Sequence, residues 1–307
     1  TRRVSALYTY LTIDLSFFFF MTRRPPRSTL FPYTPPFRSQ AFHVATSGRP
    51  GPVLVDIPKD VQFASGTYTS PKQARTEHYR PQLKGDIAAI TRLVEAMESA
   101  ARPIFYTGGG VINSGFGATQ LLRELVDATG FPITSTLMGL GGYAASGKHW
   151  MGMLGMHGLY EANMAMHDCD LMINIGARFD DRITGRLDAF SPGSIKAHVD
   201  IDASSINKVI PVDIAIIGDV AHVLEDILRI WKSRGRKTNK PQVANWWSQI
   251  KEWRKIDCLT FTNSAKTIKP QYAVQRLERS EERRVGEECR SRWSPYQEKK
   301  KKKTLKC

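Results

Sequence analysis

Hydrophobic and polar positions follow two different periodicities through the middle of the chain. Short apolar runs of strand length occur at Pro103–Thr107, Phe131–Thr136, Leu171–Ile175, Ile195–Ile201 and Ile214–Ile217. Between them lie segments whose apolar residues recur every three or four positions, as in helices with one buried face. This alternation predicts an α/β fold, with a doubly wound, mostly parallel Rossmann-like sheet and helices on both faces.

Helical periodicity is clearest in four of the intervening segments. They are Asp86–Ala100, Phe116–Thr129, Glu161–His167 and Val220–Trp231. In the first of them the apolar side chains fall on a single face, as expected of a helix that covers a sheet. Residues 86–232 have the length of one ordinary domain, so we predict that they form the central domain of the chain.

The segments on either side of this region belong to other domains in our interpretation. Val53–Ile57 is an apolar run between prolines, and it predicts the last strand of an earlier domain that residues 40–62 represent. Residues 63–85 are polar and aperiodic, which indicates a linker. Residues 233–278 are predicted to hold a second linker and the start of a further domain.

Pro241–Cys258 shows a helical pattern beyond the central region. Trp246, Ile250 and Trp253 share one face of it, and we interpret the tryptophans as packing residues. We expect this helix and the 53–57 strand to need partners outside the chain, and to expose apolar surface without them. The glycine- and methionine-rich stretch Gly152–Gly158 is predicted to be a loop.

The positive charge is concentrated at the two ends. The chain of 307 residues has a net charge of +15, of which residues 1–39 contribute +5, residues 279–307 contribute +6 and residues 40–278 only +4. A strongly basic protein suggests a nucleic-acid partner. Because the central region is only mildly basic, we expect no nucleic-acid partner.

The two ends also mirror each other at the level of codons. Read in opposite directions, residues 21–39 and 279–297 can be encoded by complementary codons at most positions, as for Phe37-Arg38-Ser39 against Arg279-Ser280-Glu281. One synthetic oligonucleotide translated in both senses would give this pattern. We therefore predict that residues 1–39 and 279–307 are foreign, disordered flanks, and we exclude them from the fold.

The cysteines and the hydropathy of the chain indicate the kind of cellular compartment in which the protein works. Outside the flanks the cysteines are Cys169 and Cys258, whose spacing fits neither a metal site nor a disulfide framework. The apolar run Leu15–Met21 is too short to cross a bilayer. These features predict a protein of a reducing compartment, without a metal site in this chain and without membrane association.

Candidate chemistry lies where the predicted strands end. Polar or glycine-rich clusters follow the strands at Gly108–Gly110, Leu137–Gly142, Gly176–Arg182, Asp200–Asp202 and Gly218–Asp219. Ligands of open α/β sheets bind beyond the carboxyl ends of the strands, where glycine lets the backbone approach a phosphate and an acidic residue accepts ribose hydroxyls. The clusters together predict a dinucleotide site, although each alone also fits a tight turn or a solvated salt-bridge loop.

Proton-transfer chemistry has little support in the sequence. His157 is a candidate for contact with a cofactor ring, whereas His167 lies on a helical face and is interpreted as structural. The spacing of the remaining residues assembles neither a nucleophilic triad nor a metal cluster. The residues therefore favour binding over catalysis.

Longer motifs are specific enough to indicate a family. They are SGRPGPVLVDIPKD from Ser47, TLMGLGGYAA from Thr136, MLGMHGLYEANMAMHDCD from Met153 and GARFDDR from Gly176. With the tryptophan-rich helix, they resemble the catalytic (large) subunit of the acetolactate synthases, which are thiamine-diphosphate-dependent enzymes. The resemblance covers residues 40–277 without a gap.

This resemblance implies an activity and a set of cofactors. The family condenses two pyruvates to 2-acetolactate and CO₂ in branched-chain amino acid biosynthesis, using thiamine diphosphate, Mg²⁺ and FAD. FAD is held largely by the central domain, where its role is structural. The FAD-binding residues that the resemblance implies are Arg49, Gly109, Leu137, Met138, His157, Gly176, Arg178, Asp180, Arg182, Asp200, Ile201 and Asp219.

The resemblance also implies what this chain lacks. The glutamate that activates thiamine diphosphate and the motif that binds Mg²⁺ both fall outside residues 40–277, so we expect neither catalytic nor metal-binding residues here and predict that the chain is inactive alone. The family further implies a homo-oligomer (dimer or tetramer), a small regulatory subunit and a cytoplasmic location. Two alternatives stay open, namely the central domain of a pyruvate oxidase or glyoxylate carboligase type of enzyme, and a non-catalytic nucleotide-binding fragment.

Overall fold

The computed structural model describes residues 34–63, 79–235, 240–264 and 266–281. The chain divides into two compact units, Thr1–Ile256 and Asp257–Cys307, and each is considered by itself. The predicted foreign flanks lie largely outside the described residues. Two helices run across the predicted flank boundaries, α2 (Thr34–Thr46) and α11 (Pro270–Glu281), and the boundaries themselves stay predictions.

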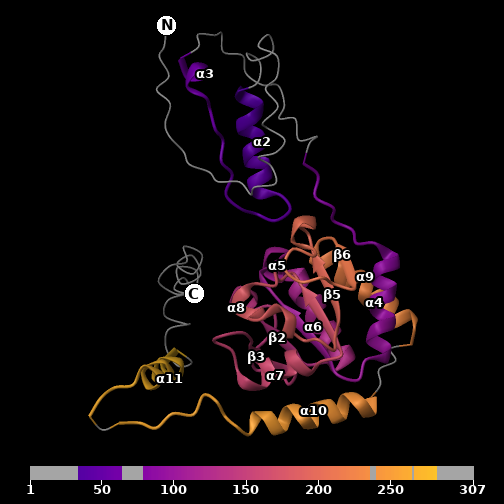
Figure 1. The fold of residues 1–307 in the computed structure, drawn as a ribbon, viewed down its shortest axis with the longest axis vertical. Helices are drawn as coiled ribbons and strands as arrows, with labels where there is room; N and C mark the ends of the chain where they lie inside the picture. Colours follow the sequence, from indigo (N-terminus) through magenta and orange to yellow (C-terminus); the bar gives the residue numbers. More distant parts are fainter. Residues whose placement is uncertain (1–33, 64–78, 236–239, 265, 282–307) are drawn as a thin grey trace, which may run out of the picture. The chain divides into compact units, whose positions relative to one another are not determined.

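A six-stranded parallel sheet forms the centre of the first unit (Figure 1). Its strand order is β3-β2-β1-β4-β5-β6, which is the doubly wound arrangement with two halves that diverge from a central pair. The predicted fold class is therefore confirmed. The strands are β1 (Pro103–Thr107), β2 (Ile133–Ser135), β3 (Trp150–Met153), β4 (Leu171–Ile175), β5 (Ile195–Asp200) and β6 (Ile214–Ile217).

Three amphipathic helices supply the core on one face of the sheet. They are α4 (Ile87–Ser99), α6 (Phe116–Thr129) and α9 (Val220–Ser233). Asp86 caps α4 by accepting hydrogen bonds from the backbone N–H groups of Ala88 and Ala89, and Gly130 ends α6 in the left-handed conformation. These caps explain why the sequence pattern located both helices to within a residue or two.

The opposite face packs against α7 (Tyr160–Asp168) and α10 (Lys240–Arg254). Side chains alternate along each strand, so Ile104 and Tyr106 of β1 face this second core while Phe105 faces the first. Trp246 and Ile250 of α10 are buried here. The interpretation of the tryptophans as packing residues is confirmed.

Hydrogen bonds fasten α10 to the amino end of the sheet. The indole N–H of Trp246 donates to the carbonyl of Pro103 at 3.1 Å, and that of Trp247 donates to the carbonyl of Gly130 at 2.8 Å. At the other end of the helix, the Arg254 guanidinium donates to the carbonyl of Trp150. The expectation that this helix needs an outside partner is wrong, because the partner is the central sheet.

Two segments differ from the sequence expectation in their local structure. Trp150–Met153 forms the edge strand β3, paired with β2, where a loop was expected around Gly152. Val53–Ile57 is not a strand: Val53 is buried but Leu54 and Ile57 are exposed. An isolated strand has no backbone partner, and Pro50, Pro52 and Pro58 remove further donors, so this segment stays irregular.

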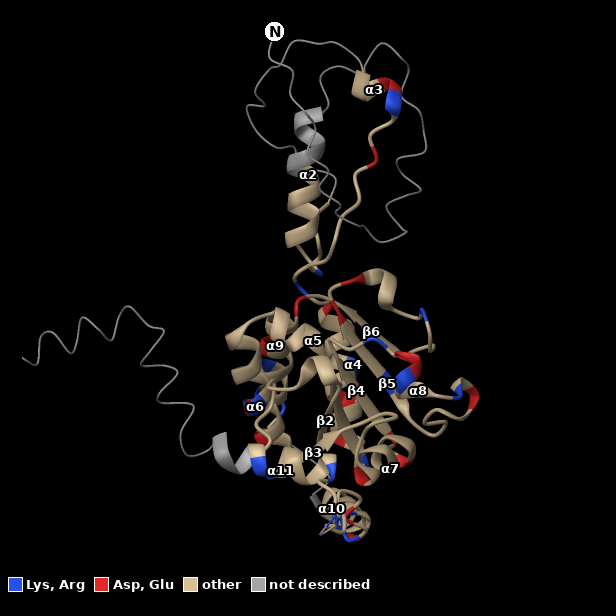
Figure 2. Ribbon diagram, turned by 90° about the vertical axis from the view of Figure 1, so that its left-hand side faces the viewer, with Lys and Arg blue, Asp and Glu red and all other residues tan. Residues whose placement is uncertain are grey.

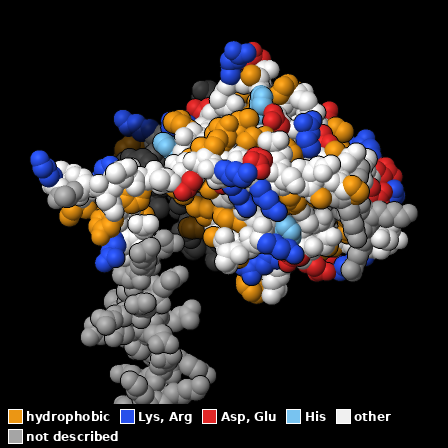
Figure 3. All heavy atoms as spheres, turned by 90° about the horizontal axis from the view of Figure 1, so that it is seen from below, with side chains coloured by type: hydrophobic (Ala, Val, Ile, Leu, Met, Phe, Trp, Pro, Cys, Tyr) orange, Lys and Arg blue, Asp and Glu red, His pale blue; other side chains and the backbone are white. Residues whose placement is uncertain are grey.

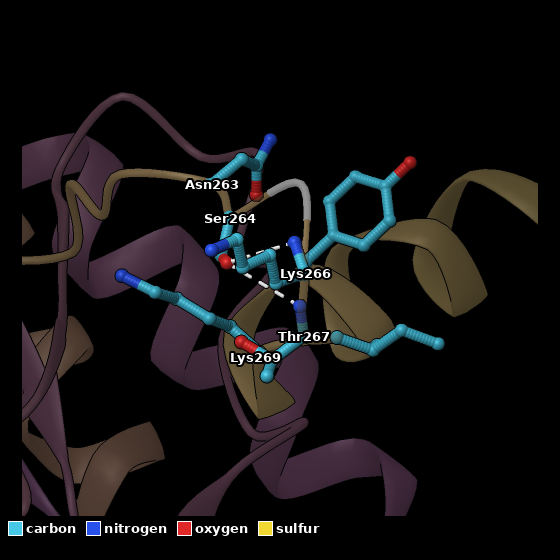
Figure 4. A pocket seen from close by; sticks show the side chains of 7 residues that line it. Asn263, Ser264, Lys266, Thr267 and Lys269 are labelled. Carbon is cyan, nitrogen blue, oxygen red and sulfur yellow. Dashed lines mark hydrogen bonds between the residues drawn. The ribbon is translucent and has the colours of Figure 1, made fainter.

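The shorter helices lie in loops around the sheet. They are α3 (Lys59–Phe63), α5 (Gly109–Asn113) and α8 (Asp181–Thr184). The second unit contains α11 and a shallow hollow of about 290 Å³ (Figure 4). It is lined by Asn263, Ser264, Lys266, Thr267, Ile268, Lys269 and Tyr272. Ser264 Oγ accepts hydrogen bonds from the backbone N–H groups of Lys266 and Thr267. Among the described helices, none is long and apolar enough to cross a membrane.

Candidate functional site

The strand order places the chain reversal between β1 and β4, and the loops that follow these two strands touch. A Cβ on Gly108 would lie 2.5 Å from the carbonyl oxygen of Gly176, and one on Gly110 would lie 2.6 Å from the Cα of Gly176. Gly176 itself has a φ of +63°, a conformation that favours glycine. We call Gly108, Gly110 and Gly176 the glycine crossing.

The loop after β2 closes over the same point. A Cβ on Gly139 would meet Ser135 Oγ at 2.6 Å and the carbonyl oxygen of Thr107 at 2.8 Å. The two residues before Gly139, Leu137 and Met138, are exposed, and Met138 lies against Gly109. The loops after β1, β2 and β4 therefore lie close together, and the surface they form consists of backbone and a few apolar side chains.

Charged residues follow β4 on the other side of the glycine crossing. Arg178 donates to Asp180 at 3.0 Å, and both side chains are more than half exposed. Arg182 lies 3.7 Å from Asp181 and is also exposed. Acidic and basic residues lie next to each other around α8 (Figure 2). Pairs this exposed contribute little to stability, so an anionic group can compete for the arginines.

Arg49, from the segment before the central region, pairs with the Asp202 carboxylate at the end of β5. Arg49 donates to Asp202 at 3.3 Å and to Ser205 Oγ at 3.4 Å. Burial by itself raises the pKa of Asp202, but hydrogen bonds from Ser204, Ser205 and Arg49 outweigh it and lower the pKa below its usual value. Asp202 is therefore ionised and fully engaged.

Asp200 and Ile201 complete the end of β5. Asp200 is buried, and its Oδ1 accepts from the backbone N–H of Asp202 at 2.9 Å. Ile201 is half-buried. The N–H of Gly176 donates to the carbonyl of Val199 at 2.8 Å, which ties the end of β5 to the glycine crossing.

Asp219 after β6 has a structural role in this arrangement. Its carboxylate caps α9 by accepting from the N–H of Ala221 at 3.1 Å, and Ser114 Oγ lies 2.8 Å from both of its oxygens. His222 Nδ1 is 3.2 Å away. Sequence reasoning missed Ser114, and no local pattern signals a hydroxyl that meets a carboxylate so far along the chain.

The structure brings some of the expected site residues together and leaves others apart. Gly109, Met138 and Gly176 lie around the glycine crossing, and Arg49 joins the end of β5. His157 is an exposed residue between β3 and α7, and Arg182 pairs on the surface. Among the described residues, no group of three or more metal-binding side chains forms a metal site.

Charge is mixed on the molecular surface. On the face seen in Figure 3, basic side chains of the described residues lie among acidic and hydrophobic ones. Exposed apolar side chains occur at the loops after β1 and β2, namely Ile112, Phe116, Leu137, Met138 and Leu140. The surface next to the glycine crossing is thus partly apolar.

Comparison with known proteins defines the class of this domain. Residues 90–227 match the family described as "Thiamine pyrophosphate enzyme, central domain". This part of the chain therefore matches the central domain of thiamine pyrophosphate enzymes, in agreement with its doubly wound sheet.

Individual relatives are more specific. The chain is 39% identical over 245 residues to the acetolactate synthase isozyme 3 large subunit of Escherichia coli (strain K12), a match that covers 79% of this chain and 42% of the relative. It is 40% identical over 242 residues to the acetolactate synthase large subunit of Haemophilus influenzae, covering 78% of this chain and 42% of the relative. It is 38% identical over 240 residues to an acetolactate synthase of Mycobacterium bovis, covering 78% and 38%. The resemblance to acetolactate synthase large subunits is confirmed, and the chain spans about two fifths of their length.

Proposed function

We propose that the central domain binds FAD at the carboxyl edge of its sheet. The observation that carries the proposal is the glycine crossing, where three strand ends meet and a Cβ on any of three glycines would collide with backbone. Such a bare backbone surface suits the approach of a pyrophosphate, and the apolar side chains beside it suit a flavin ring.

Charged groups on either side of the crossing fit the remainder of the cofactor. Asp200 would accept ribose hydroxyls, because acidic residues at strand ends do so in dinucleotide-binding folds. Arg178 and Arg49 would pair with phosphate oxygens in place of Asp180 and Asp202, their partners in this structure. FAD bound here supplies a structural scaffold rather than net redox chemistry.

The relatives suggest the activity to which this domain contributes. We propose that the chain is part of an acetolactate synthase, which joins two pyruvates with loss of CO₂ in branched-chain amino acid biosynthesis and uses thiamine diphosphate and Mg²⁺. Because the relatives are named large subunits, the proposal includes association with a small regulatory subunit. Association with copies of itself, as a dimer or tetramer, is a further part of the proposal. Among the described residues Cys169 is buried and forms no disulfide, which is consistent with a cytoplasmic location.

Flavin fluorescence tests the proposed site. Titration of the full chain into FAD is expected to quench the flavin emission saturably, and Arg178→Ala is expected to weaken binding about tenfold, the size of one charge-assisted hydrogen bond. Arg186→Ala is the matched control, because Arg186 pairs with Asp188 on the same surface at 2.8 Å but is not assigned to the site. Equal weakening by both substitutions, or no quenching by the folded chain, would contradict the proposal.

A further inference from the structure

His198 on β5 is a buried histidine whose two ring nitrogens lack hydrogen-bond partners among the described residues. Its side chain is 0% exposed, and neither Nδ1 nor Nε2 is paired. A buried polar group without a partner is costly, and an exception in a folded protein calls for a specific explanation.

The polar neighbours of His198 within the sheet are already committed. Strand register places Asn174 of β4 beside His198, and Tyr106 of β1 beside Asn174. The Asn174 side chain exchanges two hydrogen bonds with the backbone of Ala177, at 2.7 and 3.1 Å. The Tyr106 hydroxyl donates to the carbonyl of Arg178 at 3.0 Å. Neither Asn174 nor Tyr106 forms a hydrogen bond with the His198 imidazole.

Asp200 is the neighbour whose carboxylate can accept a hydrogen bond from His198. It lies two residues further along β5, so its side chain leaves the same face of the sheet as that of His198. Asp200 Oδ1 is occupied by the N–H of Asp202, whereas Oδ2 lies 3.7 Å from His198 Nε2, just beyond hydrogen-bond length. Phe179 packs edge-on against the imidazole, with ring centroids 5.2 Å apart, and keeps the ring in this orientation.

We infer that His198 is the positioning residue for Asp200, an inference that rests on the proposed nucleotide site. The His198 Nε2–H group donates to Asp200 Oδ2 when the carboxylate turns to accept a ribose hydroxyl. This hydrogen bond fixes the carboxylate beside the glycine crossing, to which the end of β5 is tied through Gly176 and Val199. His198 therefore acts through Asp200 and does not contact the ligand.

Calorimetric titration of the full chain with FAD and with ADP tests this role. His198→Leu removes the donor and is expected to weaken binding of both probes about tenfold or more, as for one hydrogen bond to a charged group. His198→Gln keeps an N–H donor and is expected to recover much of the affinity. The thermal unfolding temperature of His198→Leu is expected to match or exceed that of the unsubstituted chain, because an unpaired polar group has been removed.

A nuclear magnetic resonance measurement provides a second readout that a structural role would not move. In the ¹⁵N spectrum of the imidazole, addition of ADP is expected to select the tautomer protonated at Nε2. If His198→Leu does not fold, the glutamine variant and this tautomer shift decide the question.

The outcomes separate this inference from the proposed function. Equal affinity of the unsubstituted chain and His198→Leu would overturn the role of His198 and leave the FAD site standing. If the chain binds ADP but not FAD, and His198→Leu weakens ADP binding as expected, the proposal of a flavin ligand is wrong and the role of His198 stands. Binding of neither probe would overturn both.

Discussion

Gly176 is constrained in two independent ways. Its φ of +63° disfavours any side chain, and a Cβ there would lie 2.7 Å from the Cα of Gly110. The second constraint involves backbone on both sides, so no side-chain rotation relieves it. Glycine at position 176 therefore allows the loops after β1 and β4 to approach each other this closely.

Substitution of Gly176 should cost more than that of an ordinary left-handed glycine. Gly176→Ala is expected to lower the free energy of unfolding by about 3 kcal/mol or more, the sum of backbone strain and steric overlap. Gly130→Ala is the matched control, because Gly130 has a φ of +72° with open space around its Cβ position, and it should cost only about 1–2 kcal/mol. Chemical denaturation of both variants measures the difference, and equal losses would show that the loops are not in close contact.

A second residue-scale expectation concerns the pH dependence of His149. Burial lowers the pKa of His149, helped by Lys148 and opposed by Asp127, whose Oδ1 lies 3.4 Å from His149 Nδ1. Around the imidazole lie Tyr143, 3.5 Å from Nδ1, and the Trp247 ring of α10, with centroids 5.8 Å apart.

The sign of this pH dependence follows from proton binding. Since the folded pKa is below the unfolded value of about 6.5, the unfolded chain binds more protons in this range, and stability falls as the pH drops through about 6.5. Urea denaturation at pH 7.5 and 5.5 measures the loss. His149→Phe is expected to flatten this dependence, and an unchanged slope would contradict the assignment.

At the scale of elements, α10 packs against the central sheet. Trp246 and Ile250 are buried in the second core, and two indole hydrogen bonds join the helix to the start of β1 and the end of α6. The sequence pattern found the helix and its apolar face, but it placed the helix outside the central region and led us to expect a partner outside the chain. Periodicity shows which side of a helix is buried, and it carries no information about which distant segment covers it.

Truncation tests the contribution of α10. A chain of residues 79–256 is expected to unfold cooperatively, whereas residues 79–234 should expose the second core and bind a hydrophobic dye. Thermal unfolding followed by circular dichroism, together with dye fluorescence, distinguishes the two. Equal cooperativity in both chains would show that α10 is dispensable.

The elements predicted best are those with an apolar run between clear boundaries. β1, β4 and β6 have the bounds that the sequence indicated, because each is a short, mostly apolar run; β1 and β4 are buried throughout and β6 is partly buried at the edge of the sheet. β3 was missed because Gly152 interrupts it and because an edge strand depends on its neighbour β2 for pairing. The strand predicted at Val53–Ile57 is absent for the opposite reason, because a sequence of suitable composition does not form a strand when no neighbouring strand pairs with it.

At the scale of the whole molecule, the candidate site was predictable in outline only. The strand-end clusters were visible in the sequence, because parallel strands carry their loops to one edge. The contact of Gly108 and Gly110 with Gly176, the engagement of Asp219 with Ser114 and the unpaired His198 arise from packing between distant segments. Residue types at strand ends indicate where a ligand binds, and spatial neighbours decide which of them are available.

The chain by itself should lack acetolactate synthase activity. The match covers 42% of its E. coli relative, and the resemblance implies that the thiamine-activating glutamate and the Mg²⁺-binding motif lie outside residues 40–277. Pure chain supplied with pyruvate, thiamine diphosphate, Mg²⁺ and FAD is expected to form no acetolactate, whereas FAD at 100 times its dissociation constant should stabilise the fold by about 2.7 kcal/mol. A colorimetric acetolactate assay and thermal unfolding with and without FAD provide the two measurements, and turnover above background would contradict the first.

The fastening of α10 has a mechanical consequence. The helix is attached at its middle by Trp246 and Trp247 and at its end by Arg254, and all three bonds go to backbone carbonyls on the amino side of the sheet. A force applied to the chain beyond residue 256 is therefore borne first by these anchors. The glycine crossing lies at the opposite, carboxyl edge of the sheet, so tension from the following segment reaches the proposed site only after the anchors yield.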